Sequence, residues 1–148
     1  MKVLIGVDES VQGDQAIEFV KHMAWPSGTR MVVASAVTMP MMTAADSYAP
    51  VAFDVTGLLG ELTKIHREIA SRQAKKLADA GFTTESRVLD GDPRTALIEE
   101  ARKEHADLLI VGSHGRTGIG KLVMGSVASH IVTHAPCSVV VVRVKAAA

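Results

Sequence analysis

The sequence predicts an α/β fold, a single doubly wound domain whose five-stranded parallel sheet has the strand order 3-2-1-4-5 and helices on both faces. Short apolar, β-branched runs alternate along the chain with segments of helical periodicity, which is the pattern of repeated strand–helix units. The runs are apolar at nearly every position, as expected for strands buried on both faces of a parallel sheet. A length of 148 residues suits one domain, expected over residues 1–145, and the final alanines 146–148 resemble a cloning remnant.

The first half of the chain contains two expected strand–helix units. Residues 2–7 predict the first strand, and the helical segment that follows ends at Pro26-Ser27-Gly28. Residues 31–37 predict the second strand, and the loss of periodicity from 38 to 57 is long for a connection inside a domain, as in a lid. A long second helix that ends at Gly81 is predicted by apolar residues at helical spacing, namely Leu58, Leu62, Ile65 and Ile69.

The second half continues the alternation. Residues 85–89 predict the third strand, and Asp92-Pro93 predicts a helix start, because aspartate can cap a helix and proline suits its first position. The fourth strand, the last helix and the fifth strand are expected at 108–111, 126–134 and 138–144. In the order 3-2-1-4-5, strands one and four are neighbours whose connections leave in opposite directions, so a ligand crevice is expected at their carboxyl ends.

The connection after the fourth strand holds five glycines, at 112, 115, 118, 120 and 125. Glycine permits positive φ and lets backbone N–H groups approach a ligand closely, so such a loop can direct several donors to one anion. The helix that begins at Ser126 adds free N–H groups and the positive end of its dipole. The loop predicts a phosphate site in the same crevice as Asp8, which ends strand one.

Two familiar phosphate loops do not fit this stretch. Gly115 to Lys121 has the spacing of the nucleoside triphosphatase loop, but Leu122 stands where a hydroxyl residue should hold magnesium. The dinucleotide pattern would need a glycine at Val123. The spacing Gly112-x2-Gly115-x9-Gly125-Ser126 does fit, and it resembles the nucleotide-binding motif of the universal stress protein family. The other segments that match that family are Val3 to Asp8, Gly91-Asp92-Pro93, Ala106-Asp107-Leu108, Gly112-Ser113-His114-Gly115 and Ala135-Pro136-Cys137-Ser138.

Members of that family with this glycine pattern generally bind ATP. The resemblance therefore implies ATP with magnesium as the ligand, and AMP or ADP are further adenine nucleotides that the site could take. It implies that Asp8 contacts the base or sugar and that the backbone of Ala36 bonds adenine. The remaining candidate site residues are those of the glycine loop and its flanks: Val111, Gly112, Gly115, Arg116, Gly125, Ser126 and Val127.

Each candidate also has a plainer structural role. A glycine-rich turn needs no ligand, and Asp8 and Ser126 could each cap a helix. Val111 and Val127 could belong to the core. Arg116 and Lys121 could neutralise phosphate charge or could be solvated loop cations.

No catalytic constellation is predicted. The six histidines show no metal-ligand spacing, and His114 has no evident partner. Ser10 lacks a paired base and suits a turn or a helix cap, and Cys137 suits a buried apolar position. We expect no catalytic residue and no metal site, and any hydrolysis of ATP should be slow.

Composition narrows the partners. The 16 basic and 16 acidic residues balance, which argues against nucleic acid and anionic membranes, and an aromatic content of 3% argues against base stacking. One cysteine and no signal peptide or long apolar span predict a cytoplasmic protein. The fifth strand, Ser138 to Val144, is an expected edge strand rich in valine, which predicts a homodimer by antiparallel pairing of two copies. The family resemblance implies such a dimer as well.

Three functions stay open. The leading one is a cytoplasmic stress-response protein in which bound ATP orders the glycine loop and residues 38–57. The second is a slow ATPase or phosphotransferase that uses Asp8 as magnesium ligand or base. The third is an interaction module that binds AMP, cyclic AMP or no nucleotide.

Overall fold

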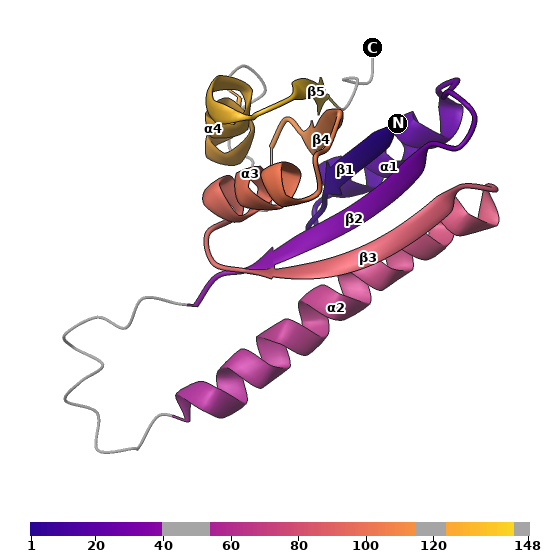
Figure 1. The fold of residues 1–148 in the computed structure, drawn as a ribbon. Helices are drawn as coiled ribbons and strands as arrows, with labels where there is room; N and C mark the ends of the chain where they lie inside the picture. Colours follow the sequence, from indigo (N-terminus) through magenta and orange to yellow (C-terminus); the bar gives the residue numbers. More distant parts are fainter. Residues whose placement is uncertain (40–53, 115–123, 144–148) are drawn as a thin grey trace, which may run out of the picture.

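The computed structural model describes residues 1–39, 54–114 and 124–143. Strands and helices alternate along these ranges, as predicted (Figure 1). The boundaries lie within a few residues of the expected ones, and β5 ends at Val142, while Val144 lies outside the described residues. The elements are β1 Lys2–Gly6, α1 Val11–His22, β2 Arg30–Val37, α2 Val55–Asp79, β3 Thr83–Asp90, α3 Pro93–Lys103, β4 Leu108–Gly112, α4 Ser126–His134 and β5 Ser138–Val142.

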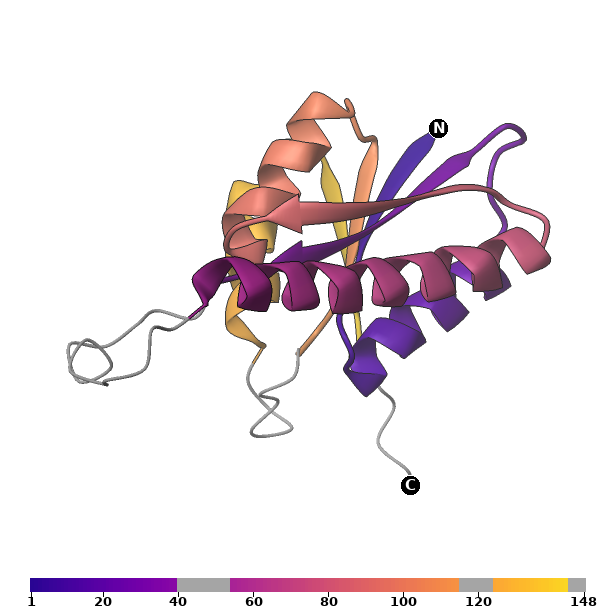
Figure 2. The same cartoon turned by 90° about the horizontal axis from the view of Figure 1, so that it is seen from below.

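The five strands form one parallel sheet in the order β3-β2-β1-β4-β5, which confirms the predicted topology. β1 lies at the centre, and its last paired residue, Gly6, is opposite Ala34 of β2 and Val111 of β4. Helices α1 and α2 cover one face of the sheet, and α3 and α4 cover the other (Figures 1 and 2). This is the doubly wound arrangement in which consecutive connections change face at the central strand.

Side chains that alternate along the strands divide the core into two layers. Val3 and Ile5 of β1 point toward α1 and α2, whereas Leu4 between them points toward α3 and α4. All three side chains are 0% exposed. The strands read as continuous apolar runs because both of their faces are buried.

Local capping contacts set the beginnings of three helices. Ser10 caps α1 and Asp54 caps α2, each by accepting a backbone N–H of the first turn. Asp92 caps α3, with Pro93 at the first helical position, so the predicted helix start is confirmed. The Arg94 guanidinium and the Arg94 backbone N–H lower the pKa of Asp92 to about 2. The carboxylate form that caps the helix is therefore the form present at neutral pH.

Helix α2 confirms the predicted helical periodicity but not the predicted burial along its whole length. Its buried residues begin at Ile69, whereas Leu58 and Leu62 are half-buried and Ile65 is 41% exposed. The first turns of the helix run beyond the ends of the neighbouring strands (Figure 1). Although α2 has 25 residues, neither it nor another helix in the described ranges is apolar enough to cross a bilayer.

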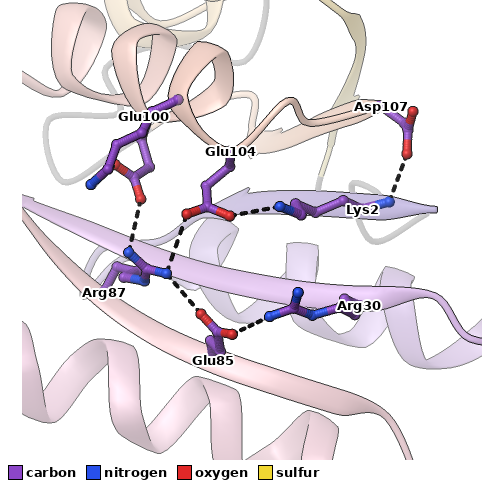
Figure 3. A network of polar contacts seen from close by, with 8 residues as sticks. Lys2, Arg30, Glu85, Arg87, Glu100, Glu104 and Asp107 are labelled. Atoms are coloured by element: carbon purple, nitrogen blue, oxygen red, sulfur yellow. Dashed lines mark hydrogen bonds and ion pairs between the residues drawn. The ribbon is translucent and has the colours of Figure 1, made fainter.

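A network of ion pairs joins α3 to the sheet (Figure 3). Arg87 of β3 lies at its centre, 2.8 Å from Glu85, 3.5 Å from Glu100 and 3.2 Å from Glu104. Lys2 extends it to β1 with a 2.8 Å contact to Glu104. Lys2 and Arg87 lower the pKa of Glu104, and Glu85 raises the pKa of Arg87. The side chain of Glu100 is only 7% exposed, and Lys103, also at 3.5 Å, is its second cationic partner beside Arg87.

We predict that Arg87→Met lowers the free energy of unfolding at pH 7 by about 1–2 kcal/mol, between the values typical of exposed and buried pairs. Because the folded pKa of Glu104 is depressed, its contribution is present at neutral pH and is lost as the pH falls through the folded value. The difference between wild type and variant should therefore shrink on acidification. Urea unfolding of both proteins at pH 7 and pH 4 measures this difference in the free energy of unfolding.

Lys75→Met is the matched control. Lys75 pairs with Asp79 on the exposed side of α2, where the two side chains are 73% and 63% exposed. Its loss should change the free energy of unfolding by less than about 0.5 kcal/mol. Equal effects of the two substitutions would show that the Arg87 network adds nothing beyond a surface ion pair.

Candidate functional site

The carboxyl ends of the parallel strands lie at one edge of the sheet, and helices α1, α3 and α4 begin there. Gly6, near the end of β1, pairs with Val111, near the end of β4. The segments that follow these two strands therefore begin side by side, as the predicted topology requires. The resulting edge combines backbone that has left the sheet with the positive ends of helix dipoles.

Asp8 supports the first turn of α1 without capping it directly. Its Oδ1 accepts the backbone N–H of Ser10 at 3.0 Å and also the Ser10 hydroxyl. Ser10 in turn is the N-cap, and its Oγ accepts the Gly13 N–H at 3.1 Å. The capping role expected for Ser10 is confirmed, and the capping alternative for Asp8 is wrong, because Asp8 orients the residue that caps.

Gly13 allows the Asp8 loop to lie against the helix. A Cβ at this position would come within 2.9 Å of the Asp8 carbonyl oxygen and 3.3 Å of Asp8 Oδ1. Sequence reasoning missed this residue. Its signal was the placement of a glycine three residues after a serine at a helix start, which is the spacing of a cap and its N3 donor.

Gly112 lies under α1. A Cβ there would meet Gln12 Cβ at 2.7 Å and the Gln12 backbone C and O at 3.0 Å. The predicted reason for this glycine was the approach of a phosphate, whereas the described contact is the approach of helix α1. The same contact joins the Asp8 segment to the glycine loop, and the part played by Gln12 had no signal in the sequence.

The two ends of the glycine loop are joined by backbone contacts. Ser113 N–H donates to the Val142 carbonyl at 2.8 Å, and Gly125 N–H donates to the Ser113 carbonyl at 2.8 Å. Gly125 is the N-cap of α4 and makes no side-chain cap bond, so Ser126 is the first helical residue and is exposed. The capping alternative for Ser126 is therefore wrong. Gly115, Arg116 and Lys121 lie outside the described residues.

Ala36 lies where β2 continues beyond β1. The Ala34 carbonyl accepts the Val7 N–H at 2.9 Å, so the backbone groups of Ala34 face β1. Polar backbone groups alternate sides along a strand, so those of Ala36, two residues on, face the same side. The pairing of β1 with β2 ends at Gly6 and Ala34, and the Ala36 backbone is thus directed past the end of β1, beside the Asp8 segment.

The two valines differ in burial. Val111 is 3% exposed and belongs to the core layer under α3 and α4. Val127 is half-buried against the same layer. The core alternative therefore describes the side chain of Val111, and only its backbone adjoins the crevice.

Two serine–histidine contacts lie in the described part of the chain, one of them between Ser35 Oγ and His66 Nδ1 at 2.8 Å. Ser113 Oγ lies 3.1 Å from His114 Nδ1, so the expectation that His114 lacks a partner is wrong. No group of three or more His, Cys, Asp or Glu side chains in the described ranges could hold a metal ion. Cys137 is half-buried, and burial raises the pKa of its thiol, as expected for an apolar position.

A shallow hollow of about 200 Å³ lies at the opposite, amino edge of the sheet. It is formed by the turns before β2 and β3, and Trp25 and Phe82 are among its lining residues. None of its lining side chains is titratable. None of the residues predicted to bind a nucleotide is among its lining residues.

Comparison with known proteins agrees with the fold and the sequence pattern. The model of the family described as "Universal stress protein family" matches residues 1–143. A universal stress protein of Thermus aquaticus is 31% identical over 145 residues, covering 95% of this chain and 97% of that protein.

Two solved structures show the same fold. Protein MJ0577 of Methanocaldococcus jannaschii has a TM-score of 0.82 at 22% identity, with 99% of this chain and 97% of that chain covered. A universal stress protein family member from Arabidopsis thaliana, solved with AMP bound, has a TM-score of 0.64 at 19% identity, with 99% and 93% covered.

We predict that Gly112→Ala lowers the free energy of unfolding by about 1–3 kcal/mol, because the added methyl group must displace the backbone of α1. Gly60→Ala is the control, since Gly60 lies in α2 and a Cβ there meets nothing within 4 Å. It should stabilise the protein by about 0.5–1 kcal/mol, as alanine does in a helix. Urea unfolding compares the stability of the two variants with that of wild type. A Gly112→Ala protein as stable as wild type would contradict the close approach of α1 to Gly112.

Proposed function

Because the chain belongs to the universal stress protein family, we propose that it is a cytoplasmic stress-response protein that binds an adenine nucleotide, with ATP as the preferred ligand. The nucleotide lies at the carboxyl edge of the sheet, between the Asp8 segment and the amino terminus of α4. It acts as a regulatory ligand, and hydrolysis is slow. Two observations carry this proposal. The first turn of α1, which Asp8 and Ser10 hold, lies against Gly112 at the end of β4. The next residue, Ser113, accepts the Gly125 N–H at the start of α4.

The phosphate end of the proposed site is the start of α4. Because the N-cap of α4 is a glycine that makes no side-chain cap bond, the first N–H groups of this helix can donate to an anion. The exposed Ser126 hydroxyl adds a donor beside them. Phosphate oxygens are the ligands that such donors favour, and this supports the part of the glycine motif that lies in the described residues.

The adenine end of the proposed site is the start of the β1–α1 connection. The backbone of Ala36 provides a donor and an acceptor beyond the end of β1, which is the pairing that an adenine edge can use. Asp8 uses Oδ1 for Ser10, and the same carboxylate can accept a ribose hydroxyl through Oδ2. The AMP bound to the Arabidopsis thaliana relative supports an adenine nucleotide as the class of ligand.

We predict that Ser126→Asp weakens ATP binding by about a hundredfold, because a carboxylate would face the phosphates across a short distance. An acidic residue in the first helical turn is favourable to the helix itself, so the melting temperature should stay equal or rise. Isothermal titration with ATP, ADP, AMP and cyclic AMP in the presence of magnesium measures the effect. ATP should lose more affinity than AMP, since it places more charge at α4.

Ser27→Asp is the control, because Ser27 is exposed in the turn before β2, at the opposite edge of the sheet. It adds the same charge and should leave nucleotide affinity unchanged. ATP binding that tolerates Ser126→Asp would place the phosphates elsewhere. If the folded protein binds none of the four nucleotides, the proposal is wrong, and an interaction module without a nucleotide becomes the favoured function.

We also propose that two copies pair through β5. The two edge strands of the sheet, β3 and β5, differ in composition. β3 carries Glu85 and Arg87, whereas β5 consists of Ser138 followed by four valines. Charged residues protect an edge strand against pairing, and an apolar edge invites it. An antiparallel two-fold contact between β5 strands would satisfy the open backbone groups of both.

We predict that wild-type protein has twice the 15.7 kDa mass of one chain by light scattering at micromolar concentration. Val140→Lys in β5 should shift this mass to that of the monomer, because two lysines would meet at the two-fold contact. Ser86→Lys, on the β3 edge, should leave the dimer intact. A wild-type protein of monomeric mass would remove this proposal.

A further inference from the structure

Two histidines lie one turn apart at the end of α4. His130 and His134 are separated by four positions, the spacing that places two side chains on one face of a helix. Their rings are stacked, with centroids 4.2 Å apart and an angle of 21° between the planes. We expected no metal-ligand spacing among the histidines, and no group of three or more possible ligands lies in the described ranges, so this pair is a smaller arrangement.

The hydrogen bond of His134 fixes which ring nitrogen carries its proton. His134 Nδ1 lies 2.9 Å from the His130 carbonyl oxygen, and a carbonyl can only accept. Nδ1 is therefore the donor, and in the neutral ring Nε2 keeps its lone pair. Histidines that bind metals typically donate their other ring nitrogen to a carbonyl or carboxylate in this way.

The position on α4 favours a cation. His134 lies in the last helical turn, where the negative end of the helix dipole stabilises positive charge. Asp92 is near enough that His130 contributes to lowering the pKa of its carboxyl, after the larger effect of Arg94. Asp92 is already paired with Arg94 and caps α3, so among these three side chains the two imidazoles are the candidate ligands.

We propose that His130 and His134 together bind a divalent transition-metal ion of the zinc and copper type. Two helical imidazoles one turn apart are the arrangement that binds zinc in H-x3-H motifs. The two rings lie 4.2 Å apart, so a rotation of the His130 ring about its soft outer torsion can turn its Nε2 lone pair toward an ion held by His134 Nε2, while the His134 ring keeps its bond to the backbone. The open positions on the ion are left for water, so binding is reversible.

The test is titration of wild-type protein with Zn²⁺ and with Cu²⁺, followed by calorimetry and by the shifts of the histidine ring protons in NMR spectra. His134→Asn keeps a donor near the position of Nδ1 and removes Nε2. It should weaken Zn²⁺ binding by at least about tenfold, as should His130→Asn. Cu²⁺ should bind more tightly than Zn²⁺, and Mg²⁺ should not bind, because imidazole prefers the later transition metals.

His22→Asn is the matched control. His22 is exposed near the end of α1 and makes the same contact, with Nδ1 2.7 Å from the carbonyl oxygen of Glu18, but the residue one turn before it is a glutamate. Its loss should leave Zn²⁺ affinity unchanged. Zn²⁺ binding that survives both His130→Asn and His134→Asn, or a wild-type protein whose His130 and His134 ring signals do not respond to Zn²⁺, would overturn the proposal.

Discussion

The close approach of helix α1 to Gly112 is the contact on which the carboxyl edge of the sheet depends. With no side chain at Gly112, the first turn of α1 can lie directly against the end of β4, and Gln12 occupies the space that a Cβ would take. The same turn is held from the other side by Asp8 and the Ser10 cap. Two connections that leave the central strands in opposite directions are thereby kept in contact. The crevice that a doubly wound sheet opens at this point is thus bordered by packed backbone, which suits a preformed ligand site.

Stability and proposed binding are carried by different parts of the sheet. The ion pairs around Arg87 join β1, β2 and β3 to α3, on the face that α3 and α4 cover, and they balance several partly buried carboxylates (Figure 3). The carboxyl edge instead presents helix amino termini and polar backbone that the sheet does not use. Substitutions in the network should therefore act on the free energy of unfolding, and substitutions at Ser126 on affinity. The separation follows from a parallel sheet, because all strands end at one edge.

Helices and strands could be predicted where a short stretch of sequence determines them. Contacts between distant segments could not, because they depend on how the strands are aligned with one another. Apolar runs, Asp92-Pro93 and the glycine at the end of β4 each determine structure within a few residues, so the strands, their order and the helix starts could be predicted from the sequence. The contact between Gln12 and Gly112 joins residues a hundred positions apart, and no sequence pattern in either segment predicts it. The Arg87 network depends on the pairing of β2 with β3, which sets Ala34 opposite Arg87. For α2 the period was right, but periodicity cannot say how far the sheet extends beneath a helix, and Ile65 is exposed.

Helix α4 connects the two proposed ligands through one physical property. Its amino terminus has a glycine N-cap and the exposed Ser126, and its last turn has an imidazole whose Nδ1 proton is donated to a backbone carbonyl. An anion at the first turn and a cation at the last turn are both stabilised by the same dipole. The helix is only nine residues long, from Ser126 to His134, so neither charge is far from the other end. Anion binding at one end and metal binding at the other would each restrain the same short helix. Because the two ligands have opposite charges, binding of one should raise the affinity for the other.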